Sequence, residues 1–119
     1  MTEKQLQNYT KINQEIFLLE MELEKENQRK QEMQADGMES ISQLSDQVRE
    51  MLSAQIRKRY QERIQMEGWI QGIEDSRVRQ AIRLHYLKCF SWQQTAMRMG
   101  VANEQTVRMM VKRYLDKGI

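Results

Sequence analysis

The sequence predicts an all-α protein, and three features of its 119 residues lead to that expectation. The chain contains no proline, the residue that interrupts helices most strongly. Gln, Glu, Lys, Arg, Met and Leu, which all favour helix, are abundant. Apolar residues also recur at helical spacing over long stretches. We therefore expect a long, coiled-coil-like antiparallel helical hairpin followed by three shorter helices.

The first expected helix covers residues 2–33 and carries a heptad stripe. Its apolar positions are Tyr9, Ile12, Ile16, Leu19 and Leu23. A stripe of about two and a half heptads is short for an independent coiled coil, so a second helix must cover it. That helix comes from the same chain or from a second copy. Three further apolar residues beside the stripe predict packing in a wider bundle: Phe17, Leu18 and Met21.

A polar stretch near residues 34–45, which contains Gly37, predicts the loop that reverses the chain. The second long helix is expected to begin at Ser45 or Asp46, because either side chain is able to cap it. Its apolar residues follow at four-residue steps: Val48, Leu52, Ile56, Tyr60 and Ile64. Residues 1–73 should thus form a hairpin arm roughly 40 Å long.

A second domain is predicted over residues 74–119, where short helices have explicit end signals. The break at Glu74-Asp75-Ser76 starts the first of them. Ser91, with Gln94 three residues later, forms a capping box for the next helix. Gly100 stands where a left-handed residue should end that helix, and Asn103 should cap the last one.

The segment from Ser91 to Leu115 has the pattern of a helix-turn-helix. Ala96 is the small residue where the two helices cross, Gly100 is the turn, and Val107 anchors the second helix. We expect Asn103 and Gln105 to read adenine, Arg108 guanine, and Thr106 or Met109 the thymine methyl. Phosphates should be held by Lys112, Arg113, Lys117 and the backbone amides at Gln93 and Gln94.

Charge is distributed unevenly along the chain. Residues 1–50 carry six Lys and Arg against eleven Asp and Glu, whereas residues 51–119 carry thirteen against six. A basic carboxy-terminal half suggests a polyanionic partner such as double-stranded DNA. A plain three-helix domain with a solvated basic face is the alternative. The spacing from Gly100 to Val107, about one residue longer than in the most compact helix-turn-helix, leaves the register of the last helix open.

The residues from Arg79 through Tyr86, then Ser91-Trp92 and the helices after them, resemble region 4 of the sigma-70-type RNA polymerase factors. The chain is more similar still to small phage-encoded regulators of the RinA/ArpU-like group, which place a long helical hairpin before sigma-like helices. The resemblance covers nearly the whole chain, although only about the last 45 residues match a recognisable motif. It implies a phage or prophage transcription regulator that acts on DNA in a bacterial cytoplasm, with RNA polymerase as a further partner.

No enzyme activity, metal or cofactor is expected. His85 and Cys89 are four residues apart, but two ligands make a poor zinc site, and no third group orients them as a nucleophile and base. No apolar run approaches the roughly 20 residues that cross a bilayer, so no membrane partner is expected. The single cysteine fits a reducing cytoplasm.

A second hypothesis assigns the function to the hairpin. The protein would then be a helical assembly or adaptor protein, or a DNA-packaging subunit similar to a phage small terminase, which combines DNA binding with helical arms. A homodimer through the hairpin is compatible with either hypothesis. Oligomeric state separates them, because a regulator should be a monomer or dimer and a packaging subunit should form a ring.

Overall fold

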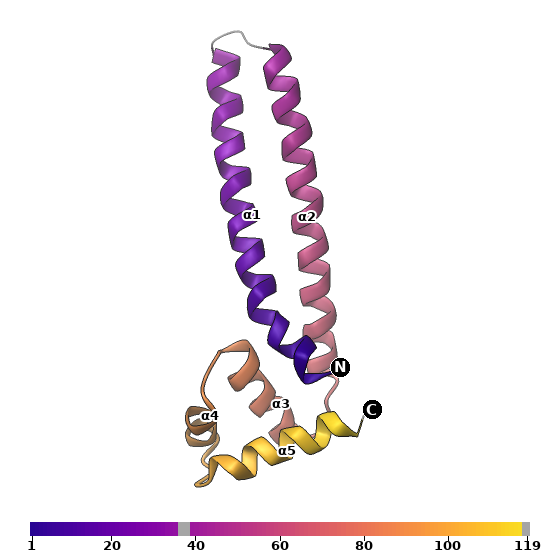
Figure 1. Ribbon diagram of the computed structural model, residues 1–119, viewed down its shortest axis with the longest axis vertical. Helices are drawn as coiled ribbons and strands as arrows, with labels where there is room; N and C mark the ends of the chain where they lie inside the picture. Colours follow the sequence, from indigo (N-terminus) through magenta and orange to yellow (C-terminus); the bar gives the residue numbers. More distant parts are fainter. Residues whose placement is uncertain (36–38, 118–119) are drawn as a thin grey trace. The chain divides into compact units, whose positions relative to one another are not determined.

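The computed structural model describes residues 1–35 and 39–117, and every regular element in these two ranges is helical (Figure 1). Helix α1 spans Glu3–Ala35 and α2 spans Glu39–Gln71. The shorter helices are α3 (Ser76–Ile82), α4 (Trp92–Met99) and α5 (Glu104–Asp116), and a π-helical segment, η1 (Arg83–Leu87), extends α3. The predicted all-α class is confirmed for these residues. None of the described helices is both long and apolar enough to cross a bilayer.

The chain divides into two compact units. The hairpin unit is Ile12–Glu62, and the C-terminal unit combines Met1–Lys11 with the chain from Arg63 onward. The predicted second domain, residues 74–119, belongs wholly to the C-terminal unit. That unit also takes in the first turns of α1 and the last turns of α2.

Within the hairpin unit, α1 and α2 run antiparallel beside each other (Figure 1). Residues early in α1 bond to residues late in α2: the Arg59 Nε lies 2.7 Å from the Glu15 carboxylate. Near the other end of the unit, the Ser45 hydroxyl donates to Glu26 at 3.2 Å. This pairing order is consistent with the predicted hairpin.

The start of the second long helix was predicted wrongly. Helix α2 begins at Glu39, six residues before Ser45. Ser45 is buried inside α2, with its hydroxyl bonded to Glu26 of α1, and Asp46 accepts hydrogen bonds from Lys30 and Arg49. Both polar side chains therefore have partners within the hairpin and cap nothing. The predicted loop near residues 34–45 falls partly on residues 36–38, which lie outside the described residues.

The four-residue stripe predicted for α2 does not stay on one face. Leu52 is buried, whereas Val48 and Ile64 are exposed. Four residues turn a helix by 400°, so each step moves the stripe roughly 40° around the axis. Over the four steps from Val48 to Ile64 the apolar positions leave the seam.

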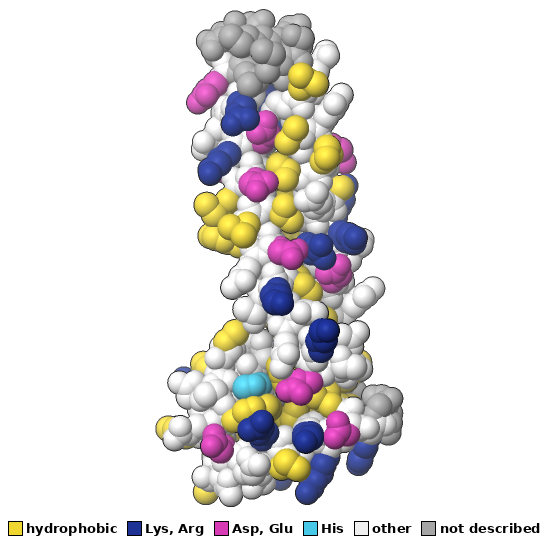
Figure 2. Space-filling view, viewed as in Figure 1, with side chains coloured by type: hydrophobic (Ala, Val, Ile, Leu, Met, Phe, Trp, Pro, Cys, Tyr) yellow, Lys and Arg dark blue, Asp and Glu magenta, His cyan; other side chains and the backbone are white. Residues whose placement is uncertain are grey.

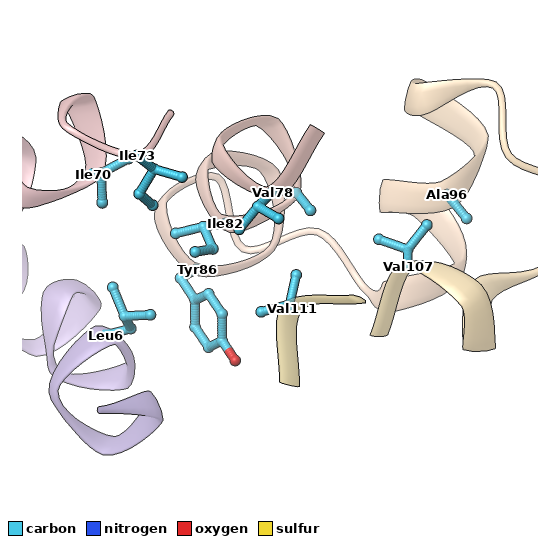
Figure 3. Packing of buried hydrophobic residues seen from close by; sticks show 10 residues of the cluster. Leu6, Ile70, Ile73, Val78, Ile82, Tyr86, Ala96, Val107 and Val111 are labelled. Atoms are coloured by element: carbon cyan, nitrogen blue, oxygen red, sulfur yellow. The ribbon is translucent and has the colours of Figure 1, made fainter. Parts of the chain in front are cut away.

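The C-terminal unit has one continuous hydrophobic core (Figure 3). Its buried residues come from α1, the end of α2 and the connection after it, α3, η1, α4 and α5. They are Leu6, Ile70, Ile73, Val78, Ala81, Ile82, Tyr86, Ala96, Val107 and Val111. Leu6 is fully buried, although the heptad stripe expected from the sequence begins only at Tyr9. The first turn of α1 is thus part of the domain that carries α4 and α5.

Candidate nucleic-acid interface

Helix α4 begins with the predicted capping box. The Ser91 Oγ accepts a hydrogen bond from the Gln94 N–H at 3.1 Å, and the Gln94 Oε1 accepts one from the Ser91 N–H at 2.9 Å. The reciprocal pair satisfies two backbone donors that would otherwise lack partners. The backbone N–H of Gln94 already donates to Ser91 in the cap. Of the two backbone amides predicted to hold a phosphate, that of the exposed Gln93 is therefore the better placed.

The turn between α4 and α5 is made by Gly100, as predicted. Gly100 has φ 72° and ψ 26°, in the left-handed region, and the Val101 N–H donates to the Ala96 carbonyl at 2.9 Å. A side chain at this φ would crowd its own backbone, which is why glycine suits the position. Ala96, the predicted crossing residue, is buried against the same core.

Asn103 caps α5, and this role limits what else its side chain can do. Its Oδ1 accepts the Gln105 N–H at 2.9 Å. Bidentate recognition of adenine needs both the oxygen and the nitrogen of the side-chain amide. While the cap is formed, one lone pair of the Asn103 Oδ1 is used and the side chain is held in place, which restricts how it can meet a base.

Two buried valines fix which side of α5 faces outward. Val107 and Val111 are buried in the core, and the Tyr114 ring meets the Trp69 ring edge-on at 6.2 Å between centroids. The opposite side carries most of the predicted contact residues in exposed positions, while Met109 is half-buried. The exposed residues are Gln105, Thr106, Arg108, Lys112 and Arg113.

Arg108 and Lys112 lie on the flank of α5 that borders α1. With Thr2, with Glu3 at the start of α1 and with Tyr86, they line a hollow of about 270 Å³. Burial raises the pKa of the Tyr86 hydroxyl, the Glu3 carboxylate raises it further, and the Arg108 charge lowers it. The carboxylate of Glu3 and the guanidinium of Arg108 therefore act on the same small region of the C-terminal unit.

A second hollow, of about 540 Å³, separates the beginnings of α4 and α5. Gln93 and Met97 line it from α4, and Asn103 and Glu104 line it from α5. Sequence reasoning missed Met97 and Glu104. Met97 had one usable signal, because it follows Gln93 by four residues and so shares its side of the helix.

Positive charge is concentrated in the C-terminal unit. This unit contains twelve Lys and Arg against six Asp and Glu, whereas the hairpin unit contains seven against eleven. Lys and Arg side chains are visible over α5 on the face shown in Figure 2. Within the described part of the chain, Arg108, Lys112 and Arg113 form no ion pair.

Comparisons of the chain with models of protein families, with curated proteins and with solved structures gave no match. The features that bear on function are therefore the side chains of α4 and α5 and the charge of the unit that carries them.

Proposed function

We propose that the C-terminal unit binds duplex DNA through α4 and α5, which act as a helix-turn-helix, and that the protein is a transcription regulator of phage or prophage type. The main support is α5 itself. It is capped at Asn103, anchored by Val107 and Val111, and exposes cations on its outer side. A helix held in this way is rigid enough to enter a major groove without rearrangement.

Affinity in this proposal comes from the backbone of the DNA. Lys112 and Arg113 lie in the second half of α5, where a recognition helix passes the phosphates. The N–H at Gln93, in the first turn of α4, offers a further phosphate contact at a helix amino terminus. Each phosphate that is neutralised releases counterions, so binding should weaken as salt is added.

Specificity comes from the first turns of α5. Gln105 is placed to read adenine, Thr106 offers its methyl group to thymine, and Arg108 offers two donors to guanine. Asn103 contributes less to base recognition than an unrestrained side-chain amide would, because its oxygen accepts the capping hydrogen bond. In a bacterial cell, contact with RNA polymerase would follow binding at a promoter, as the resemblance to sigma region 4 implies.

Fluorescence anisotropy with a labelled random duplex at low salt tests the proposal. We expect binding that weakens steeply with salt, because several cations displace counterions. Lys112→Ala should weaken binding to every sequence alike, while Arg108→Ala should relax the preference at one base position. Lys25→Ala, at an exposed lysine of the hairpin unit, is the matched control and should change neither. Absence of binding at low salt would refute the proposal.

A second candidate function is assembly, with the protein as a packaging subunit or adaptor. The observation that favours it is the set of large apolar side chains exposed along the hairpin unit, including Phe17, Leu18 and Met51. Light scattering in solution separates the two candidates, because a packaging subunit should form a ring of many copies. A regulator should be no larger than a dimer.

A further inference from the structure

We infer that one face of the hairpin unit is a self-complementary interface for a second copy of this chain, with α1 of each copy against α2 of the other. The proposal does not depend on DNA binding. It concerns residues of Ile12–Glu62 alone, and it specifies the face and the arrangement of the two copies.

Outside residues 33–42, whose side chains are not described, the hairpin unit exposes more large apolar side chains than it buries. Ile12, Ile16 and Leu52 are the buried hydrophobic residues of this described part. Its exposed large hydrophobic residues are Phe17, Leu18, Met21, Leu44, Val48 and Met51. Two helices bury one seam between them, and these side chains lie outside it. Stable helical bundles cover such residues with further helices.

The exposed residues of α2 have the spacing of a coiled-coil seam. Leu44, Val48, Met51, Gln55 and Lys58 follow one another at alternating steps of four and three residues. This rhythm keeps positions on one side of a helix, because it averages 3.5 residues per turn. Leu44, Val48, Met51, Gln55 and Lys58 are all exposed, so the stripe is available to a helix from another molecule.

The last two residues of this stripe, Gln55 and Lys58, line a groove of about 540 Å³ along the hairpin unit. Leu18 and Leu19 contribute its apolar part. Glu15 and Glu22 of α1 line one side of the groove, the acidic bank, and Lys58 and Arg59 of α2 line the other side, the basic bank. Glu15 and Arg59 already bond to each other across the groove at 2.7 Å. Within the described residues, Glu22 and Lys58 form no ion pair.

This charge pattern points to a second copy of the chain as the molecule that covers the groove. A two-fold axis parallel to the helices would lay the groove of one copy on the groove of the other. The acidic bank of each copy would then face the basic bank of its partner, which brings Glu22 of each copy toward the basic bank that contains Lys58. A two-fold axis perpendicular to the helices would instead place α1 on α1, with acid against acid. Interfaces that use the same patch on both partners are the commonest in homo-oligomers.

Sedimentation analysis of the full chain over a range of concentrations tests the inference. We expect a monomer–dimer equilibrium that Glu22→Lys or Lys58→Glu weakens by about tenfold, because each reversal places like charges together at two positions. The double variant Glu22→Lys/Lys58→Glu restores opposite charges and should regain the dimer. A monomer at every concentration would overturn the inference, as would a double variant no better than the single ones.

A matched pair of polar substitutions locates the interface on the hairpin. Leu18 and Phe17 are similarly exposed, at 58% and 63%, but only Leu18 lines the groove. Neighbouring residues point about 100° apart around a helix. Leu18→Gln should therefore weaken the dimer and Phe17→Gln should leave it unchanged. Equal effects of the two substitutions would place the contact elsewhere. DNA binding can be measured on the same variants, so a failed dimer and a failed DNA interface are distinguishable.

Discussion

The Tyr86 hydroxyl donates a hydrogen bond to the Glu3 carboxylate at 3.3 Å and so joins the π-helical segment to the first turn of α1. The Tyr86 ring is buried and meets the Trp92 ring edge-on at 6.1 Å between centroids. The amino-terminal residues of the chain are thereby tied to the domain that carries α4 and α5. One consequence is that the first turn of α1 contributes to the stability of the proposed DNA-binding domain.

Replacing Tyr86 with Phe should lower the free energy of unfolding by about 1 kcal/mol, because the part-buried hydrogen bond from the Tyr86 hydroxyl to the Glu3 carboxylate is lost. Tyr60→Phe is the matched control. The Tyr60 hydroxyl also donates to a carboxylate, that of Glu20 at 2.7 Å, but this bond is exposed to solvent. Its removal should cost less. Urea denaturation measures both values, and an equal loss in the two variants would contradict the role given to Tyr86.

Two glycines should respond in opposite ways to the same change. An added Cβ meets nothing within 4 Å at either Gly68 or Gly100, so only backbone conformation differs. Gly100→Ala should destabilise the protein by about 1–2 kcal/mol, because Gly100 has a φ of 72°. Gly68→Ala, within α2, should stabilise it by about 0.5 kcal/mol. A neutral result at Gly100 in chemical denaturation would argue against the left-handed turn.

His85 should make the protein less stable as the pH falls. Burial lowers its pKa below the usual 6.5, although the hydrogen bond from its Nδ1 to the Phe90 carbonyl partly opposes this. The unfolded chain therefore binds a proton at a pH where the folded chain does not. The contribution is present above pH 6.5 and is lost as pH drops through the lowered value.

Denaturation midpoints between pH 7.5 and 5.5, an interval of roughly one unit either side of the usual histidine pKa, check this expectation. The control is His85→Asn, which keeps a donor near the Phe90 carbonyl and removes the titrating group. The variant should show a flatter pH dependence, whatever its absolute stability. A slope equal to that of the native chain would show that His85 is not responsible.

The two roles proposed for Asn103 can be separated with two substitutions. Asn103→Ala removes the cap and should destabilise α5 by about 1 kcal/mol, whereas Asn103→Ser retains a capping oxygen. If the side chain acts mainly as a cap, the Ser variant should bind DNA as the native chain does. Thermal melts and anisotropy report stability and binding respectively. A Ser variant that is fully stable but binds DNA weakly would assign Asn103 to base contact.

The sequence carried enough information for the ends of the short helices, because those signals are local. Ser91 with Gln94, the turn at Gly100 and the cap at Asn103 each act within three or four residues, and all three are confirmed. Ser45 shows the limit of this reasoning. A serine before an apolar run resembles a cap, but the hydroxyl of Ser45 bonds to Glu26, nineteen residues away.

Long-range packing and backbone irregularity were harder to predict from the sequence. Nothing in the sequence marks the π-helical segment Arg83–Leu87, or the positive φ of 61° at Cys89 that follows it. Leu6 gave only a weak signal, three residues before Tyr9, that the start of α1 packs with helices far along the chain. In the candidate interface, Glu3 and Met97 each line a hollow. Their positions there depend on tertiary contacts of the same kind.

The central claim, that α5 and the start of α4 meet DNA, is tested most directly by titrating the isotope-labelled protein with duplex DNA and following its backbone amide signals. We predict shifts concentrated at Gln93, at Gln105 to Arg108, and at Lys112 and Arg113. Amides of the hairpin unit should move little. Shifts confined to the hairpin unit, or an unchanged spectrum at low salt, would contradict the claim.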